Sequence, residues 1–289
     1  MVLVVLGMIA LLLGAILTLV SSSPVSSLLS LREKIGVVNI EGAITDSEPV
    51  VTQLVQFRKD KGIKAIVLRI DSPGGAVAPS QEIYWEVKKA AASKPVIASM
   101  GKVAASGGYY VACAANKIVA NPGTLTGSIG VLMEFLQVED LLKKIGVGIE
   151  VLKTGEFKDI GSPHRKLSEK DRELISSLIS DIQKQFVEAV ARGRNLPIEK
   201  VREIADGRIL SGAQSKEHGL VDELGNFQDA LELAKKMTGV EGEVTLVYPK
   251  KKGSRLWDFV LRDASEALYS FLRKIPGMRI EYRWDGFPN

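Results

Sequence analysis

The sequence predicts an α/β domain built on a largely parallel sheet and preceded by a membrane-spanning helix. Three observations predict this class: short runs rich in Val and Ile, helical patterns between these runs, and an uncharged apolar segment at the N-terminus. Strands that are apolar on both faces are typical of parallel sheets covered by helices. With 289 residues, 46% of them hydrophobic and 25% charged, the chain is expected to fold around a sizeable core.

Residues 1–20 contain no charged side chain and are long enough for a helix of about 30 Å, the thickness of the hydrocarbon layer. A cleaved signal peptide would carry basic residues before a shorter apolar stretch. None precede this one, so we expect a retained anchor, followed by a Ser-rich linker over 21–34. The nearest basic residues, Arg32 and Lys34, follow the segment and by charge alone would place the C-terminal side in the cytoplasm.

The main domain is predicted over 35–249, with short apolar strands alternating with helices. The predicted strands are 35–40, 65–70, 95–100, 117–120 and 147–152. The predicted helices are 50–61, 79–91, 139–145, 168–194 and 226–237, and a capping-box pattern opens the fourth of these.

Residues 250–289 form a basic amphipathic C-terminal tail. Apolar residues recur at helical spacing between Trp257 and Phe271, after three consecutive lysines. This pattern predicts a helix that packs on its own domain or on a neighbouring subunit. Docking on a membrane surface is the alternative, with the arginines near lipid headgroups.

Composition excludes several classes of site. The 38 basic and 34 acidic residues leave a net charge of +4, too small an excess to indicate nucleic-acid binding. The single cysteine, Cys113, excludes an intramolecular disulfide framework and thiolate-rich metal sites. The two histidines, His164 and His218, leave little room for a catalytic triad based on imidazole. We expect no metal and no cofactor.

Two glycine-rich turns follow predicted strands. The segment 69–75 ends in Ser-Pro-Gly-Gly, which is either an ordinary tight turn or a place where backbone N–H groups face a cleft and bind an oxyanion. The segment 100–110 places Ser106 before Gly107, at the start of a helical run. A serine there either caps the helix or acts as a nucleophile near the positive end of the helix dipole.

Two further segments, 124–130 and 153–163, contain Ser128 and Lys158. Taken singly, Ser128 is a turn residue and Lys158 a solvated lysine. Together with the glycine turns they supply a hydroxyl, a base and an oxyanion site. A lysine has a pKa of about 10.4 in water and becomes a general base only when desolvation lowers that value. By contrast, Cys113 is predicted to be a small buried residue, and His164 a surface residue.

From about residue 34 to 247 the chain resembles the signal peptide peptidase A family, serine proteases with the ClpP/crotonase fold. The resemblance runs in order through DSPGG, MGKVAASGGYYVACAANKIVANPGTLTGSIGV and KTGEFKDIGSP. It implies that Ser106 is the nucleophile, Lys158 the general base, and Ser128 the residue that positions the lysine. It also implies oxyanion-hole amides at Gly75 and Gly107, with Gly74 as the alternative to Gly75.

The same resemblance implies a single-pass protein of the cell membrane whose catalytic domain lies on the extracytoplasmic side. Its substrates would be signal-peptide remnants and other apolar peptides. Family members are homo-oligomers in which Ser and Lys can come from adjacent subunits. With one catalytic-type domain the chain resembles the short form of the family, although it lacks basic residues before the anchor.

Two other functions fit the same fold. The first is a non-catalytic membrane scaffold that keeps the fold and assembles through it. The second is acyl-CoA chemistry, in which paired backbone amides polarise a thioester. The acyl-CoA alternative would need a carboxylate base and a basic pocket for the nucleotide.

Overall fold

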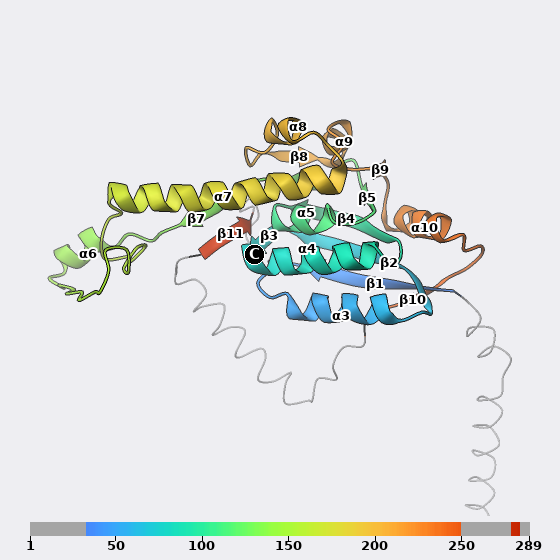
Figure 1. The fold of residues 1–289 in the computed structure, drawn as a ribbon, viewed down its shortest axis with the longest axis horizontal. Helices are drawn as coiled ribbons and strands as arrows, with labels where there is room; N and C mark the ends of the chain where they lie inside the picture. The colour runs from blue at the N-terminus through green and yellow to red at the C-terminus, as the bar shows by residue number, and fades with distance from the viewer. Residues whose placement is uncertain (1–32, 250–278, 284–289) are drawn as a thin grey trace, which may run out of the picture.

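The computed structural model describes residues 33–249 and 279–283, with only the backbone described for the second range (Figure 1). The strands are β1 (Lys34–Glu41), β2 (Ile63–Ser72), β3 (Gly74–Ala76), β4 (Val96–Ala105), β5 (Lys117–Ala120), β6 (Leu125–Gly127), β7 (Leu132–Glu134), β8 (Ile209–Ser211), β9 (Glu223–Leu224), β10 (Thr245–Val247) and β11 (Arg279–Arg283). The helices are α3 (Glu48–Lys59), α4 (Val77–Ala91), α5 (Gly107–Ala112), α6 (Glu139–Lys144), α7 (Glu169–Arg194), α8 (Ile198–Arg202), α9 (Gly212–Glu217) and α10 (Phe227–Thr238).

The central sheet has the strand order β10-β1-β2-β4-β5-β9, and all of these pairs are parallel. Strand β6 pairs parallel with the end of β4 and antiparallel with β8. A second sheet has the order β3-β11-β7 with antiparallel pairs. The prediction of an α/β domain with a largely parallel sheet is therefore confirmed.

Helices cover both faces of the central sheet. Along β2, Ile66, Leu68 and Ile70 belong to the larger core under α3, α4, α5 and α7, whereas Ala65 and Val67 belong to the smaller core under α10. Because side chains alternate between the faces of a strand, a sheet covered on both sides needs apolar residues at consecutive positions. This requirement explains the continuous apolar runs in the sequence.

The predicted strand over 147–152 is wrong. These residues have no regular secondary structure, and Leu152 is 91% exposed. They follow α6 on an extension, here called the arm and comprising residues 135–168, which reaches beyond the sheet to the left in Figure 1. Apolar alternation produces a strand only where a neighbouring strand accepts its hydrogen bonds, and none is present in the described part of the chain.

Three predictions fall on residues that are not described. They are the anchor over 1–20, nearly all of the linker over 21–34, and the helix expected between Trp257 and Phe271. Within residues 33–249 and 279–283, no helix is both long enough and apolar enough to cross a bilayer.

Candidate active site

Ser106 lies at the junction where β4 ends and α5 begins. Its backbone angles, φ +54° and ψ −118°, lie in a region that costs a residue with a side chain on the order of 1–3 kcal/mol. The residue is 1% exposed, and its Oγ has no hydrogen-bond partner within the described residues. In particular, Oγ does not cap α5. A strained strand-to-helix turn that presents an unbonded hydroxyl is typical of a nucleophile.

Aromatic packing fixes α5 in the core. Tyr110 packs between Tyr84 of α4 and Phe186 of α7, with ring centroids 4.9 and 5.0 Å apart. Tyr109 is fully buried and donates to the carbonyl of Leu220 at 2.9 Å. Both tyrosines are core residues, and their packing holds the Ser106 junction in place.

The two glycine turns meet beside Ser106. A Cβ added to Gly107 would lie 3.2 Å from the Gly75 nitrogen and 2.6 Å from Ser80 Oγ. On the other side of β3, Ile44 donates to the Gly74 carbonyl and accepts from the Ala76 N–H. The Gly74 carbonyl and the Ala76 N–H thus point toward Ile44. In a strand the N–H and carbonyl of the residue between them point to the opposite side, so the N–H of Gly75 faces away from Ile44. As the first residue of α5, Gly107 has an N–H with no partner inside the helix.

Ser128 lies beside Ser106 although 22 positions separate them in the chain. Strand β6 pairs with β4 so that Gly127 is opposite Ala105, and the Ser106 N–H donates to the Gly127 carbonyl at 2.9 Å. Ser128 is buried and, like Ser106, has a left-handed backbone, with φ +49°. The structure therefore brings together Ser106, Ser128 and both glycine turns.

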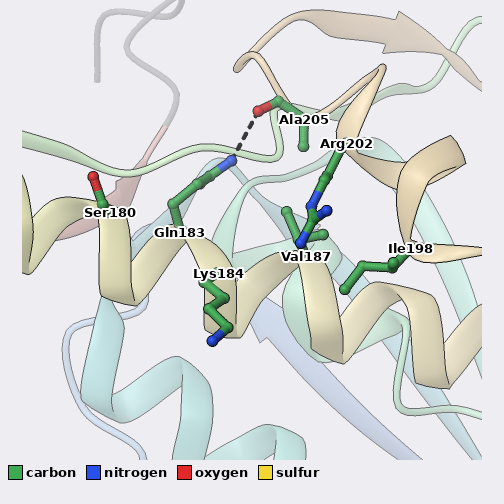
Figure 2. Close-up of a pocket in the computed structure, with 7 residues that line it drawn as sticks. All are labelled: Ser180, Gln183, Lys184, Val187, Ile198, Arg202 and Ala205. Atoms are coloured by element: carbon green, nitrogen blue, oxygen red, sulfur yellow. Dashed lines mark hydrogen bonds between the residues drawn. The ribbon is translucent and has the colours of Figure 1, made fainter.

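Helix α7 supports the Ser128 turn from outside. Gln183 donates to the carbonyls of Ala205 and Ile129, at 2.8 and 3.3 Å, and Ile129 directly follows Ser128. Figure 2 shows the first of these bonds beside a cavity of about 300 Å³. Its lining residues are Ser180, Gln183, Lys184, Val187, Ile198, Arg202 and Ala205. Because neither Ser106 nor Ser128 lines it, this cavity is separate from the candidate nucleophile.

Lys158 is not brought to Ser106 within the described chain. It lies on the arm, and its side chain is exposed and makes no hydrogen bond or ion pair with any described residue. Arg165 and Asp159 attach the turn that carries it to Asp171, in the first turn of α7. Gln183 supports the Ser128 turn 12 residues farther along the same helix, which is about 18 Å at 1.5 Å per residue.

Cys113 and the two histidines are not among the residues that the structure gathers around Ser106. Cys113 is fully buried, and burial raises the pKa of its thiol to about 12, which keeps it protonated and unreactive. His218 is the C-cap residue of α9. His164 lies on the arm, close in sequence to Lys158, and its Nε2 is buried without a partner among the described residues.

Sequence patterns missed the supporting residues Ser80, Gln183 and Arg165. Ser80 and Gln183 are polar residues on amphipathic helices and carry no local pattern that distinguishes them. Only Asp171 was marked, through the capping box that it forms with Ser168 at the start of α7. Its second partner, Arg165, could not be inferred from that box.

Comparison with known proteins agrees with this arrangement. The model of peptidase family S49 matches residues 88–241, and the Clp protease model matches residues 22–124. The chain is 44% identical over 213 residues to "Putative protease slr0021" of Synechocystis, covering 73% of this chain and 77% of that protein. It is 38% identical to "Putative signal peptide peptidase SppA" of Enterococcus faecium, covering 71% and 64%.

A plant relative extends the comparison. The chain is 36% identical to "Serine protease SPPA, chloroplastic" of Arabidopsis thaliana, covering 78% of this chain but only 34% of the plant protein. The match to the Enterococcus protein also falls short of two thirds of that protein's length. The family models and the relatives nevertheless agree on the type of enzyme. The chain is a ClpP-like protease of the SppA type and belongs to peptidase family S49.

Proposed function

We propose that the protein is a membrane-anchored serine endopeptidase that uses Ser106 as nucleophile and Lys158 as general base. The observation that carries this proposal is the buried Ser106 Oγ, which has no hydrogen-bond partner among the described residues and lies on a strained turn. An unpaired buried hydroxyl costs on the order of 1–3 kcal/mol. A fold that keeps such a group together with backbone strain does so where the hydroxyl has work in a reaction.

The proposed reaction proceeds through an acyl-enzyme. Ser106 Oγ attacks the peptide carbonyl carbon while its proton passes to the neutral Lys158 amine. The protonated lysine then donates to the leaving nitrogen as the C–N bond breaks, which leaves an ester on Ser106. Water attacks this ester, gives a proton to Lys158, and that proton returns to Oγ when the ester bond breaks. Ser128 orients the amine between these transfers.

The N–H groups of Gly75 and Gly107 are the proposed donors to the oxyanion. The orientation of Gly75 away from Ile44 and its closeness to Gly107 support this assignment over one with Gly74. Gly74 uses its carbonyl to accept from Ile44 and its N–H to donate to Ser72 Oγ at 3.1 Å. Donors held in place before the reaction stabilise the tetrahedral intermediate without reorganisation.

The Gly75→Ala variant is expected to be both less stable and less active. Its Cβ would lie 2.1 Å from the Ile44 carbonyl oxygen, a backbone atom that cannot move aside cheaply. We expect a loss of roughly 1–3 kcal/mol in the free energy of unfolding, measured by urea denaturation. We also expect a decrease of roughly 100- to 1,000-fold in kcat/KM for an apolar peptide.

Gly123→Ala is the matched control, because its Cβ would meet no atom within 4 Å and its backbone is not left-handed. This variant should match the wild type in both measurements. If Gly75→Ala also matched the wild type, the close fit of Gly75 against Ile44 would not hold its N–H in place for the reaction.

We propose further that the site is completed by a second copy of the chain. Support comes from the exposure of Lys158. Support also comes from α7, where Asp171 holds the turn with Lys158 and Gln183 holds the Ser128 turn about 18 Å farther along the helix. The arm also exposes apolar side chains to a degree unusual for a surface that stays in water. These are Leu136, Leu141, Ile145, Val147, Ile149, Val151, Leu152 and Phe157. Packing of the arm against a neighbouring copy would bury them and desolvate Lys158.

The proposed substrates are remnants of signal peptides and similar apolar peptides, bound in extended form. The pairing of β11 between β3 and β7 supports extended binding, because β11 lies beside Gly74, Gly75 and Ala76 on the side away from Ile44. An extended peptide would take the place of β11 there and leave the Gly75 N–H to the oxyanion. The name of the Enterococcus relative, a signal peptide peptidase, supports the substrate class. Residues 1–20 would anchor the protein in the cell membrane as a single span, with the catalytic domain outside the cytoplasm.

A fluorophosphonate probe tests the proposed function. We expect the detergent-purified full-length protein to be labelled at Ser106, identified by mass spectrometry of the adduct. Labelling requires an activated hydroxyl, so an assembled protein that takes up no probe would favour the scaffold alternative. Saturable binding of CoA in a titration, without labelling, would favour acyl-CoA chemistry.

A further inference from the structure

The lysines around the turn that carries Lys158 differ in one respect that concerns the proposed base. Residues 153–170 contain four lysines, and three of them are paired with carboxylates: Lys153 with Asp159, Lys166 with Asp140, and Lys170 with Glu156. Lys158 alone has no carboxylate partner among the described residues. This lysine also directly precedes Asp159, so a carboxylate is available next to it in the chain.

Two cations engage the Asp159 carboxylate instead. Lys153 Nζ and Arg165 Nη2 both donate to Oδ1, at 2.7 and 2.8 Å, and the Asp159 side chain is 11% exposed. Hydrogen bonds from Arg165, and then from Lys153, hold the pKa of Asp159 well below its usual range. The carboxylate is thus ionised, and its charge is already compensated by groups other than Lys158.

Arg165 also ties this turn to helix α7. Its Nη1 donates to Asp171, whose side chain is only 2% exposed and whose second role is to accept from the Ser168 N–H at 2.9 Å in the capping box. Hydrogen bonds from Arg165, and then from the Ser168 backbone, lower the pKa of Asp171 to about 2. One guanidinium therefore joins the carboxylate beside Lys158 to the rigid first turn of a 26-residue helix.

We propose that Arg165 is a positioning residue for Lys158, which it keeps unpaired by holding Asp159 against α7. This inference rests on the proposed function, since it assumes that Lys158 is the base. A carboxylate released beside a lysine would pair with the ammonium and stabilise its protonated form. A general base must give up that proton near the working pH, so capture of Lys158 by Asp159 would impair the reaction.

The charged groups around Asp159 are few. Lys153 and Arg165 face its carboxylate directly, and Asp171 stands behind Arg165 on α7. Glu156, in the same turn, is paired with Lys170. Removal of Arg165 would leave Lys153 as the remaining cation on Asp159. The Lys153 side chain is 33% exposed, so water also reaches this pair. Lys158 would then compete for the same carboxylate.

The test is the pH–rate profile of the Arg165→Gln variant in the full-length assembled enzyme. We expect kcat/KM at neutral pH to decrease roughly 10- to 100-fold, mostly through kcat. We also expect the midpoint of the profile to move up by about 1 pH unit, because the freed carboxylate favours the protonated lysine. Arg165→Lys retains a cation at this position for Asp159, so its midpoint should lie close to the wild-type value.

A second substitution separates this mechanism from a purely structural effect. In the Arg165→Gln/Asp159→Asn double variant no carboxylate is left to capture Lys158, so the midpoint should return toward the wild-type value although the anchor is missing. Arg172→Gln is the matched control on the same helical turn, since Arg172 is 60% exposed and its ion pair with Glu169 is 3.9 Å long. That variant should leave the profile unchanged.

The inference is overturned if Arg165→Gln keeps the wild-type midpoint, however low its rate, or if the double variant keeps the shifted one. Should Arg165→Gln fail to fold, Lys153→Gln replaces it, with a smaller upward shift expected and an unchanged midpoint as the contrary result. A Lys158→Ala variant with wild-type activity would instead refute the proposed function. A normal midpoint in Arg165→Gln combined with an inactive Lys158→Ala would refute only the role of Arg165.

Discussion

Replacing Ser106 with Ala is expected to reduce kcat for an apolar peptide by on the order of 10⁴- to 10⁶-fold, because no other hydroxyl takes the place of a lost nucleophile. The fold should survive this change. In the part of the chain that the structure describes, the Ser106 Oγ has no partner to lose, so its removal relieves an unsatisfied buried group. We expect the free energy of unfolding to stay within about 1 kcal/mol of the wild-type value.

Both quantities are measurable on one preparation, by peptide hydrolysis in detergent and by urea denaturation followed by circular dichroism. Ser215→Ala is a matched control, because Ser215 is also fully buried and its Oγ also lacks a partner, but it lies on α9. That variant should keep wild-type turnover. Persistent hydrolysis by Ser106→Ala would remove this residue from the mechanism.

The Lys158→Ala variant is expected to lose activity to a similar extent, on the order of 10⁴-fold or more, because Ser106 then lacks a group to take its proton. Stability should hardly change, since the Lys158 side chain is exposed and makes no hydrogen bond or ion pair with any described residue. Lys200→Ala, which removes an exposed lysine on α8, is the control and should remain fully active.

Mixing the two inactive variants tests how the site is assembled. If the base comes from a neighbouring copy, co-assembly of Ser106→Ala and Lys158→Ala in equal amounts should restore about a quarter of the wild-type activity. In that case, random association creates some sites that have both groups. If serine and lysine act within one chain, no mixed site is complete and the mixture stays inactive. The second result would refute the shared site while leaving the dyad intact.

Much of the fold could be predicted from local patterns. The strands around β1, β2, β4 and β5, and the helices α4, α7 and α10, lie within a few residues of the predicted ranges. Their periodicity and caps are properties of consecutive residues, so they are visible without a structure. The prediction failed at 147–152, where apolar alternation was present but a partner strand was not. Short strands such as β6 and β8 were missed because only their partners define them.

In the candidate site, too, some features were visible in the sequence and others only in the tertiary structure. The sequence by itself supplied the candidate groups, since the glycine turns, Ser106, Ser128 and Lys158 follow one another in the order that resembles the family. The tertiary structure decided which of them meet: the pairing of β6 with β4 places Ser128 beside Ser106, and Ile44 orients Gly75. It also left Lys158 exposed on the arm, with its neighbouring carboxylate held by Arg165. The physical reason is that short-range patterns encode the direction and capping of each element, whereas closeness between distant residues depends on how whole elements pack.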